Sequence, residues 1–236
     1  MSSSGGARRL VASAMAAFVV GVLLQARPEA HGVSGIDALF LQGITGTAIG
    51  PLMYLGAKHM VTGYDHLAFL VGVVFFLYRV RDVALYVSLF TLGHSVTLLA
   101  GVLGGIEANA YLVDAVIGLS VVYKALDNLD AFPQVFGVRP DPRAAVLVFG
   151  LFHGFGLATK LQALALPAPG LVVNIVSFNV GVELGQALAL TLVMALLMAW
   201  RAHPGYVRHA FATNTLLMCA GFLLLGYQLS AYVLTT

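Results

Sequence analysis

The sequence predicts an all-α membrane protein, a bundle of six transmembrane helices that follows an N-terminal signal sequence and has both mature termini outside. Three observations support this fold class. Of the 236 residues, 60% are hydrophobic and only 9% are charged, and the mean hydropathy is +0.93, whereas soluble domains are roughly 45–50% apolar. The apolar residues form runs long enough to cross a bilayer, and arginines recur in alternate connections between these runs. A lipid bilayer is therefore the expected environment.

Charge and cysteine content exclude two other classes of function. The net charge of +2 comes from few residues, most of them at the ends of apolar runs, so no nucleic-acid partner is expected. A single cysteine, Cys219, excludes an intrachain disulfide and a metal site built from several thiolates.

Residues 1–30 have the layout of a secretory signal peptide, with two arginines before a short apolar run and small or polar residues after it. Ala30 suits the last position before a cleavage site, but Pro28 is a poor match to the small residue expected two positions earlier. A cleaved signal peptide and an uncleaved anchor both stay open. Cleavage after Ala30 would make His31 the new N-terminus, where its α-amine and imidazole could chelate a metal together. A solvated loop histidine is the alternative.

Residues 31–55 are rich in Gly, Thr and Ser and lack a clean helical period, so they predict an exterior loop followed by a short helix from about Pro51. Residues 56–236 predict one domain, the six-helix transmembrane domain. A helix needs roughly 20 apolar residues to cross a bilayer, and each span must be helical because unpaired backbone groups are too costly in hydrocarbon. The predicted spans are about 64–80, 83–103, 111–127, 144–166, 171–200 and 210–234.

Basic residues are distributed unevenly over the connections between these spans. The connections after the first, third and fifth spans carry Arg79 and Arg81, Arg139 and Arg143, and Arg201 and Arg208. The opposite connections, GGIEANA and LPAPG, contain neither lysine nor arginine. The positive-inside rule makes the first set cytoplasmic. The start of the first span and the C-terminus are then outside.

The stretch Gly56–Phe69, GAKHMVTGYDHLAF, opens the apolar part of the chain with two histidines and an aspartate. On one continuous helix His59, Gly63 and His66 fall at i, i+4 and i+7, so both imidazoles would share a face beside Asp65. The loop charges place this motif at the outer mouth of the predicted bundle. It therefore predicts an entrance that binds a metal ion.

Ionisable and polar groups also interrupt the later spans, where a charged side chain costs about 2.5–3.5 kcal/mol and usually faces the bundle interior. A lone buried histidine is more often a packed core group, but four histidines beside two carboxylates in so uncharged a chain favour function. Lys160 is expected to snorkel to the outer surface, and Lys124 to pair with Asp127 one turn away. The candidate metal ligands in these spans are His94 in FTLGHSVTL, Asp114, His153 in GLFHGFGLATK, and Asn179 and Glu183 in FNVGVELGQ.

The donor types narrow the choice of ion. Imidazole nitrogen with carboxylate oxygen suits Ni²⁺, Co²⁺ or Zn²⁺, whereas Cu(I) favours thiolate and thioether ligands and Mg²⁺ or Ca²⁺ favours oxygen alone. Ligand types do not separate nickel, cobalt and zinc, because selectivity among them needs geometry. The expected ligand is a transported Ni²⁺ or Co²⁺ ion, with Zn²⁺ as the alternative, and no bound cofactor is expected.

Five motifs in order, GAKHMVTGYDHLAFL, FTLGHSVTL, VDAVIGLSVVYKALDNL, GLFHGFGLA and FNVGVELGQ, resemble the HupE/UreJ family of bacterial nickel/cobalt permeases over about residues 50–200. The resemblance implies a multi-pass secondary permease of the bacterial inner membrane that moves Ni²⁺ or Co²⁺ inward for metalloenzyme assembly. Asp114 departs from the family's pattern, which would place a glutamate there. The resemblance carries the family's metal signature onto His59, Asp65, His66, His94, His153, Asn179 and Glu183.

Transport is therefore the predicted function, and the protein is not expected to be an enzyme. The ion would be captured by the Gly56–Phe69 motif, pass His94, His153 and Glu183 at mid-depth, and leave near Asp127 and Asn128. The alternative is an intramembrane zinc-dependent hydrolase, in which three histidines hold zinc and a carboxylate activates water. A closed ligand cluster would favour the hydrolase, and a file of sites would favour the permease. A structural partner subunit is a third reading, and a homo-oligomer also stays open.

Overall fold

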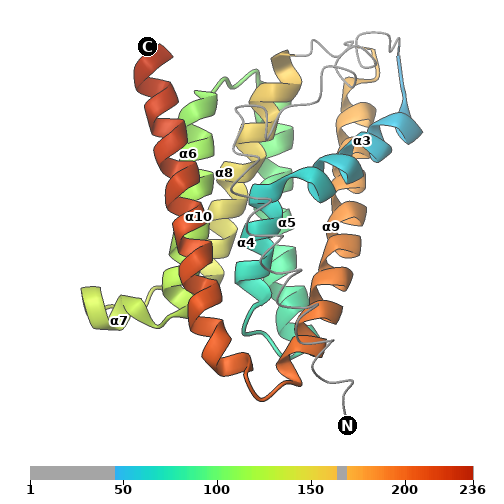
Figure 1. The fold of residues 1–236 in the computed structure, drawn as a ribbon. Coiled ribbons are helices and arrows are strands. Elements are labelled where there is room, and N and C mark those ends of the chain that lie inside the picture. The colour runs from blue at the N-terminus through green and yellow to red at the C-terminus, as the bar shows by residue number, and fades with distance from the viewer. Residues whose placement is uncertain (1–45, 164–168, 236) are drawn as a thin grey trace.

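The computed structural model describes residues 46–163 and 169–235, and these contain helices and no strand (Figure 1). The predicted signal sequence, His31 and most of the predicted exterior loop lie outside the described residues. The all-α class is confirmed for the described part of the chain. Its helices are α3 (Ile49–Thr62), α4 (Tyr64–Val74), α5 (Val80–Gly104), α6 (Ala110–Asn128), α7 (Ala131–Phe136), α8 (Pro142–Ala163), α9 (Leu171–Arg201) and α10 (Tyr206–Thr235).

Four helices of the described chain, α5, α8, α9 and α10, are long and apolar enough to cross a membrane. Their bounds agree with four of the predicted spans to within a few residues. Helix α6 matches the third predicted span, but its 19 residues include two aspartates and a lysine. The first predicted span, residues 64–80, is wrong, because α4 ends at Val74 after 11 residues. Such a helix is only about 16 Å long, and the predicted count of six spans is not confirmed.

The end of α4 is held by a side chain from α9. The last carbonyls of a helix lack partners within it and attract a positive charge. The guanidinium of Arg201 donates to the carbonyl oxygens of Val74 at 2.7 Å, Phe75 at 2.5 Å and Leu77 at 2.8 Å. The hydroxyl of Tyr206 also donates to the Phe75 carbonyl, at 2.8 Å. The chain can therefore leave the helix at Val74 with its carbonyls satisfied.

The predicted continuous helix through Gly56–Phe69 is also wrong. Gly63 separates α3 from α4 and has an extended backbone, with φ −74° and ψ 98°. Its N–H still bonds the carbonyl of His59 at 2.9 Å, and its carbonyl accepts from Leu67 at 3.0 Å. In Figure 1, α3 runs obliquely from the edge of the bundle to its middle, and α4 continues from there along the bundle. The break therefore lies inside the bundle.

Glycines allow three pairs of helices to pack backbone against backbone, as small residues do in membrane bundles. In the α5–α8 pair, a Cβ added to Gly93 would lie 2.5 Å from the carbonyl oxygen of Leu147. In the α6–α10 pair, a Cβ added to Gly118 would lie 2.7 Å from the backbone nitrogen of Leu225. In the α3–α9 pair, a Cβ added to Gly185 would lie 2.6 Å from the carbonyl oxygen of Ala57.

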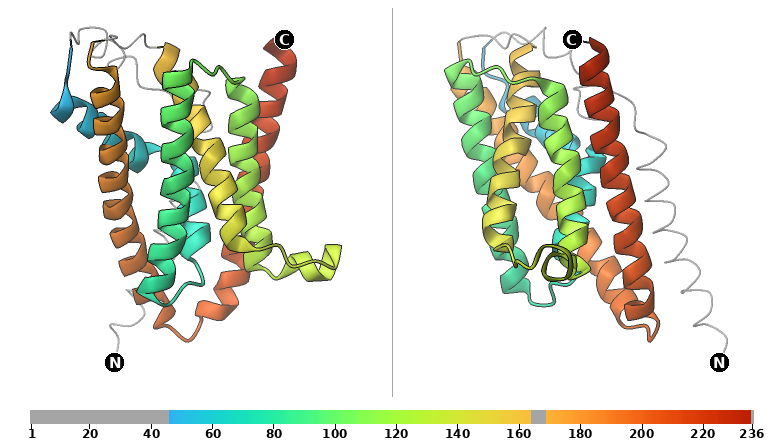
Figure 2. Two further views of the ribbon diagram at one scale, coloured as in Figure 1. Left: turned by 180° about the vertical axis from the view of Figure 1, so that it is seen from behind. Right: turned by 90° about the vertical axis from the view of Figure 1, so that its left-hand side faces the viewer.

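The connections at the two ends of the bundle differ in charge. The α4–α5 connection, the segment around α7 and the α9–α10 connection, which carry the arginines, lie at one end, here called the basic end (Figures 1 and 2). The α5–α6 connection lies at the other end together with the C-terminus of α10, and this is called the C-terminal end. The structure thus gathers the three arginine-bearing connections on one side.

Candidate metal centre

Four helices bring histidines together inside the bundle. His59 lies in the last turn of α3, His66 in the first turn of α4, and His94 and His153 near the middle of α5 and α8. The ring centroid of His66 lies 4.8 Å from that of His153, 5.2 Å from that of His59 and 6.1 Å from that of His94. We call these four residues and Asp65 the histidine cluster. His66 is at its centre because the break at Gly63 starts α4 in the middle of the bundle.

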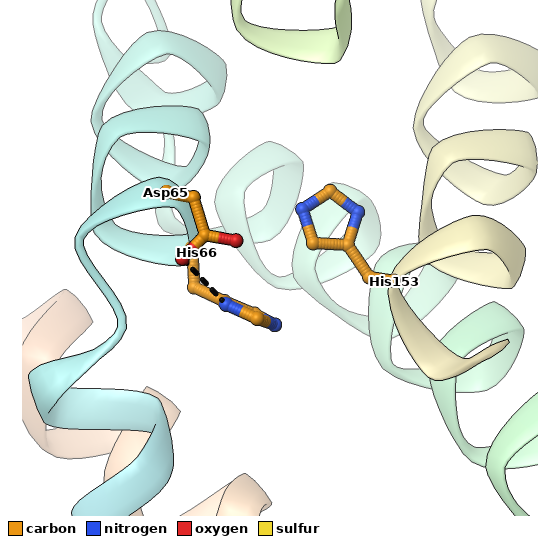
Figure 3. A group of neighbouring side chains, drawn as sticks. All are labelled: Asp65, His66 and His153. Carbon is orange, nitrogen blue, oxygen red and sulfur yellow. Dashed lines mark hydrogen bonds and ion pairs between the residues drawn. The ribbon is translucent and has the colours of Figure 1, made fainter. Parts of the chain in front are cut away.

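Asp65, His66 and His153 form the tightest part of the histidine cluster. One donor atom from each lies within 4.8 Å of the other two. Their side chains are 2%, 2% and 1% exposed. Figure 3 shows Asp65 and His66 on the first turn of α4 facing His153 on α8. Ligand atoms of one tetrahedral ion lie roughly 3.3 Å apart, so these side chains would have to move closer together to hold a metal jointly.

Hydrogen bonds define which nitrogens are available to a metal. The Nδ1–H of His153 donates to the carbonyl of Phe149 at 2.8 Å, so the lone pair lies on Nε2. That Nε2 is buried and has no hydrogen-bond partner among the described residues, and the same holds for both nitrogens of His94. Nδ1 of His66 lies 3.2 Å from Oδ1 of Asp65. Buried polar atoms that lack partners are costly, and a bound cation would satisfy them.

The α5–α8 contact sets the positions of His94 and His153. Gly154 follows His153, and its Cα packs directly on the carbonyl of His94. The hydroxyl of Thr97, one turn after His94, donates to the carbonyl of Leu151 on α8 at 2.7 Å. The two histidines are thus presented from a rigid pair of helices.

Aromatic rings surround the histidine cluster on the side of the basic end. The Phe90 ring centroid lies 5.0 Å from that of His153, and the Phe69 centroid lies 5.5 Å from it. Both phenylalanines are buried. In the sequence these phenylalanines look like any other apolar residue of a span. Phe69 follows His66 by three residues and Phe90 precedes His94 by four, spacings that share a helix face and were the available signal. Apolar rings in this position lower the local dielectric and would strengthen electrostatic interactions with a bound ion.

The predicted location of the Gly56–Phe69 motif at an outer mouth is wrong. Its histidines lie beside the midpoints of α5 and α8. The predicted file of sites is also not what the structure contains in this region, because His59, Asp65, His66, His94 and His153 form one compact cluster. Helical spacing alone could not fix the depth of His66, because the break at Gly63 and the course of α3 set it.

Two predicted ligands lie on α9. Asn179 is buried, and its Oδ1 has no partner among the described residues. Glu183 is exposed and lines a groove of about 510 Å³ between α5 and α9. Thr91 and Gln186 also line this groove, and the Thr91 hydroxyl donates to Oε1 of Gln186 at 3.1 Å. The groove lining contains none of the four clustered histidines.

Asp114, which is buried, forms an ion pair with the half-buried Lys160, with 3.2 Å between Nζ and Oδ2. The prediction that Lys160 snorkels to the surface is wrong, because its side chain is only 18% exposed and reaches from α8 to α6. The seven-residue spacing from His153, which puts both residues on one face of α8, was the available signal.

The predicted exit residues have structural partners. Lys124 forms an ion pair with Asp127, as the i, i+3 spacing predicts. The Asn128 amide donates to the Gly72 carbonyl and to Oδ1 of Asn214, both at 2.8 Å. These bonds join α6 to α4 and α10 near the basic end.

Comparison with known proteins supports the resemblance found in the motifs. The model of a protein family described as HupE / UreJ protein matches residues 36–236. No curated protein and no solved structure matches the chain.

Proposed function

Because the chain belongs to the HupE / UreJ family, we propose that it carries Ni²⁺ or Co²⁺ across a bacterial inner membrane and binds the ion in the histidine cluster. The protein is a secondary transporter in this proposal. The C-terminal end faces outward and the basic end faces the cytoplasm, as the arginine-bearing connections indicate. Asn179 and Glu183 on α9 belong to the polar path that leads to or from the cluster.

The observation that carries this proposal is the approach of Asp65, His66 and His153 inside the bundle, with donor atoms within 4.8 Å of one another. Imidazole and carboxylate donors suit Ni²⁺, Co²⁺ and Zn²⁺. His59 and His94 stand next to them and offer further nitrogens to a partly dehydrated ion. A site at mid-depth is reachable from either side if the helices around it move.

The broken α3–α4 segment supports transport in a second way. Secondary transporters commonly bind their ions near the bilayer midplane, where discontinuous helices leave backbone groups at the site. Here Gly63 divides the segment next to His59 and His66, and a short helix can be displaced more easily than a full span. The driving force is sufficient as well, because an interior-negative potential of about 100 mV supplies about 4.6 kcal/mol to a divalent ion.

The test is uptake of radioactive nickel and cobalt by metal-starved cells that express the wild type or His66→Ala. Outer-shell groups of metal sites typically contribute roughly 10–100-fold to affinity or activity, so loss of a direct ligand should reduce uptake by at least tenfold. The matched control is His209→Ala, because His209 is exposed at the basic end and its loss should leave uptake unchanged. Normal uptake by His66→Ala at normal membrane levels would remove the histidine cluster from the route.

The compact cluster is also the arrangement that favours the zinc-dependent hydrolase. Three histidines and a carboxylate are a ligand set that such enzymes use. Metal exchange separates the two functions. A transport site in purified protein should exchange bound nickel with free nickel within the time of a turnover, whereas one zinc ion that persists through purification and does not exchange would favour the hydrolase.

A further inference from the structure

The Asp114–Lys160 ion pair lies inside the bundle and near its C-terminal end. Asp114 is in the second turn of α6, and Lys160 is in the last turn of α8. The Asp114 side chain is 5% exposed, and Lys160 Nζ approaches Oδ1 at 3.4 Å and Oδ2 at 3.2 Å. The ammonium thus covers both oxygens of the carboxylate.

The carboxylate lies between the ammonium and the histidine cluster. His153, Gly156 and Lys160 follow one another at i, i+3 and i+7 along one face of α8. A Cβ on Gly156 would lie 3.6 Å from Asp114 Oδ1, so the carboxylate stands opposite Gly156. Gly156 is about 4.5 Å along the helix axis from His153. An ion bound to Asp114 would therefore be about one helical turn from the cluster.

We propose that Lys160 is a tethered cation that closes the approach to the histidine cluster from the C-terminal end, and that an incoming divalent cation enters by displacing its ammonium from Asp114. This inference rests on the proposed transport function and adds a gate to it. The carboxylate is then the first binding site of the ion inside the bundle. Lys160 swings away on its flexible stem, and it returns when the ion moves on to His153 and His66.

Charge and dehydration explain why such a gate selects divalent ions. A buried carboxylate requires a cationic partner, because leaving it unpaired is strongly unfavourable. A monovalent ion offers it no more charge than the ammonium already does, whereas a divalent ion offers twice as much. The gate therefore opens for divalent cations and stays closed to sodium and potassium without a separate size filter.

The experiment measures the KM and maximal rate of nickel uptake for Lys160→Met. This variant removes the competing ammonium and keeps the apolar stem. The expected result is a KM lower by about tenfold, the factor that corresponds to one charge-assisted hydrogen bond. If KM is unchanged and the maximal rate falls only in proportion to the amount of variant protein in the membrane, the pair is only structural and the proposal is overturned.

Two further variants keep the test decisive. The double variant Asp114→Asn/Lys160→Met lacks the carboxylate, so its KM should be no lower than that of the wild type; a KM as low as in the single variant would overturn the proposal. If Lys160→Met does not reach the membrane, Lys160→Arg replaces it. Its guanidinium should hold the carboxylate with two bonds and raise KM several-fold, and a KM at or below the wild-type value would overturn the proposal.

The matched control is an exposed ion pair of the same chain. Arg139 and Asp130 pair at 3.2 Å with side chains 74% and 59% exposed, next to α7. Asp130→Asn removes this pair and keeps a residue that tolerates the left-handed backbone found there, with φ 52°. Its KM should equal that of the wild type. Absence of metal uptake in the wild type itself would instead contradict the proposed function.

Discussion

His94 and His153 face the same space but are held in different ways. His153 is oriented by its bond to the Phe149 carbonyl, the kind of outer-shell contact that fixes a metal-ligating imidazole. His94 has no such bond among the described residues, although it is only 1% exposed. A side chain buried in this way reduces stability unless something binds it. Functional sites commonly reduce the stability of the unliganded protein in this way, so the unpartnered His94 fits a binding site.

His94→Leu removes two buried nitrogens that have no hydrogen-bond partner among the described residues, so the unfolding temperature of the metal-free variant should stay at or above that of the wild type. Nickel at about 100 times its Kd should stabilise the wild type by about 2.7 kcal/mol, and should stabilise the variant less. Thermal unfolding of purified protein in detergent, with and without nickel, measures both effects. A less stable variant that keeps the full nickel effect would make His94 a core residue.

The members of the histidine cluster were predictable from the sequence, but their closeness to one another inside the bundle was not. His59, Asp65, His66, His94 and His153 stood out because titratable groups are rare in apolar spans. Their depths in the bundle depend on where each helix starts and on the course of α3. The residue pattern within one helix contains no information on either. The prediction for the Lys160 side chain was wrong for a related reason. A lysine near a helix end is normally drawn to the surface, and only the position of Asp114 on α6 keeps it inside.

Among the helices, length and apolar content predicted α5, α8, α9 and α10 well. A short helix from about Pro51 was predicted, and α3 begins at Ile49. The ends of α3 at Thr62 and of α4 at Val74 were not predicted, because local spacing is the same on either side of a break. His59 and His66 fit one continuous helix in sequence, and the extended backbone at Gly63 reverses that expectation. The end of α4 at Val74 depends on Arg201, which lies far away in the chain. Contacts of this kind cannot be read from a hydrophobic period.

The second prediction concerns the packing of α5 against α8. In Gly154→Ala, the new Cβ would overlap the carbonyl of His94 and the hydroxyl of Thr97. The helices must separate, which should destabilise the protein by about 1–3 kcal/mol and weaken nickel binding by moving His153. The control is Gly226→Ala on α10, where a Cβ would meet nothing within 4 Å. It should be neutral or slightly stabilising, because alanine is the better helix former.

Thermal unfolding and nickel titration of the two glycine variants provide the comparison. Equal stability of Gly154→Ala and Gly226→Ala would mean that α5 and α8 can accommodate a methyl group between Gly154 and the carbonyl of His94. Loss of stability without loss of nickel binding would separate the helix contact from the metal site.

Across the whole molecule, charge divides the bundle into two unlike ends. The three arginine-bearing connections lie together at the basic end, and the α5–α6 connection at the other end has no basic residue. This grouping was predictable because an alternating pattern over antiparallel helices puts every second connection on the same side. Arg201 contributes less to the positive charge of the basic end than its position suggests, because its guanidinium is hydrogen-bonded to the backbone at the end of α4.

The third prediction tests the orientation of the molecule. In a Cys219→Ala background, single cysteines are introduced as Glu107→Cys at the C-terminal end and Val138→Cys at the basic end, both at exposed positions. A maleimide that cannot cross membranes should label Glu107→Cys in intact spheroplasts, and should label Val138→Cys only after the membrane is opened. The reverse pattern would place the basic end outside and invert the direction of the proposed entry route.

Helix α9 contacts both helices of the broken α3–α4 segment. Its middle presses on α3 where Gly185 meets Ala57, and its last residue, Arg201, is fastened to the far end of α4. Gly63 is the single residue of chain between the two helices, so α9 contacts both sides of a possible hinge. When α9 tilts or slides, the angle between α3 and α4 must change, and Asp65 and His66 at the hinge are carried with it. In the proposed transport cycle, the affinity of the cluster for the ion would thereby depend on the tilt of α9.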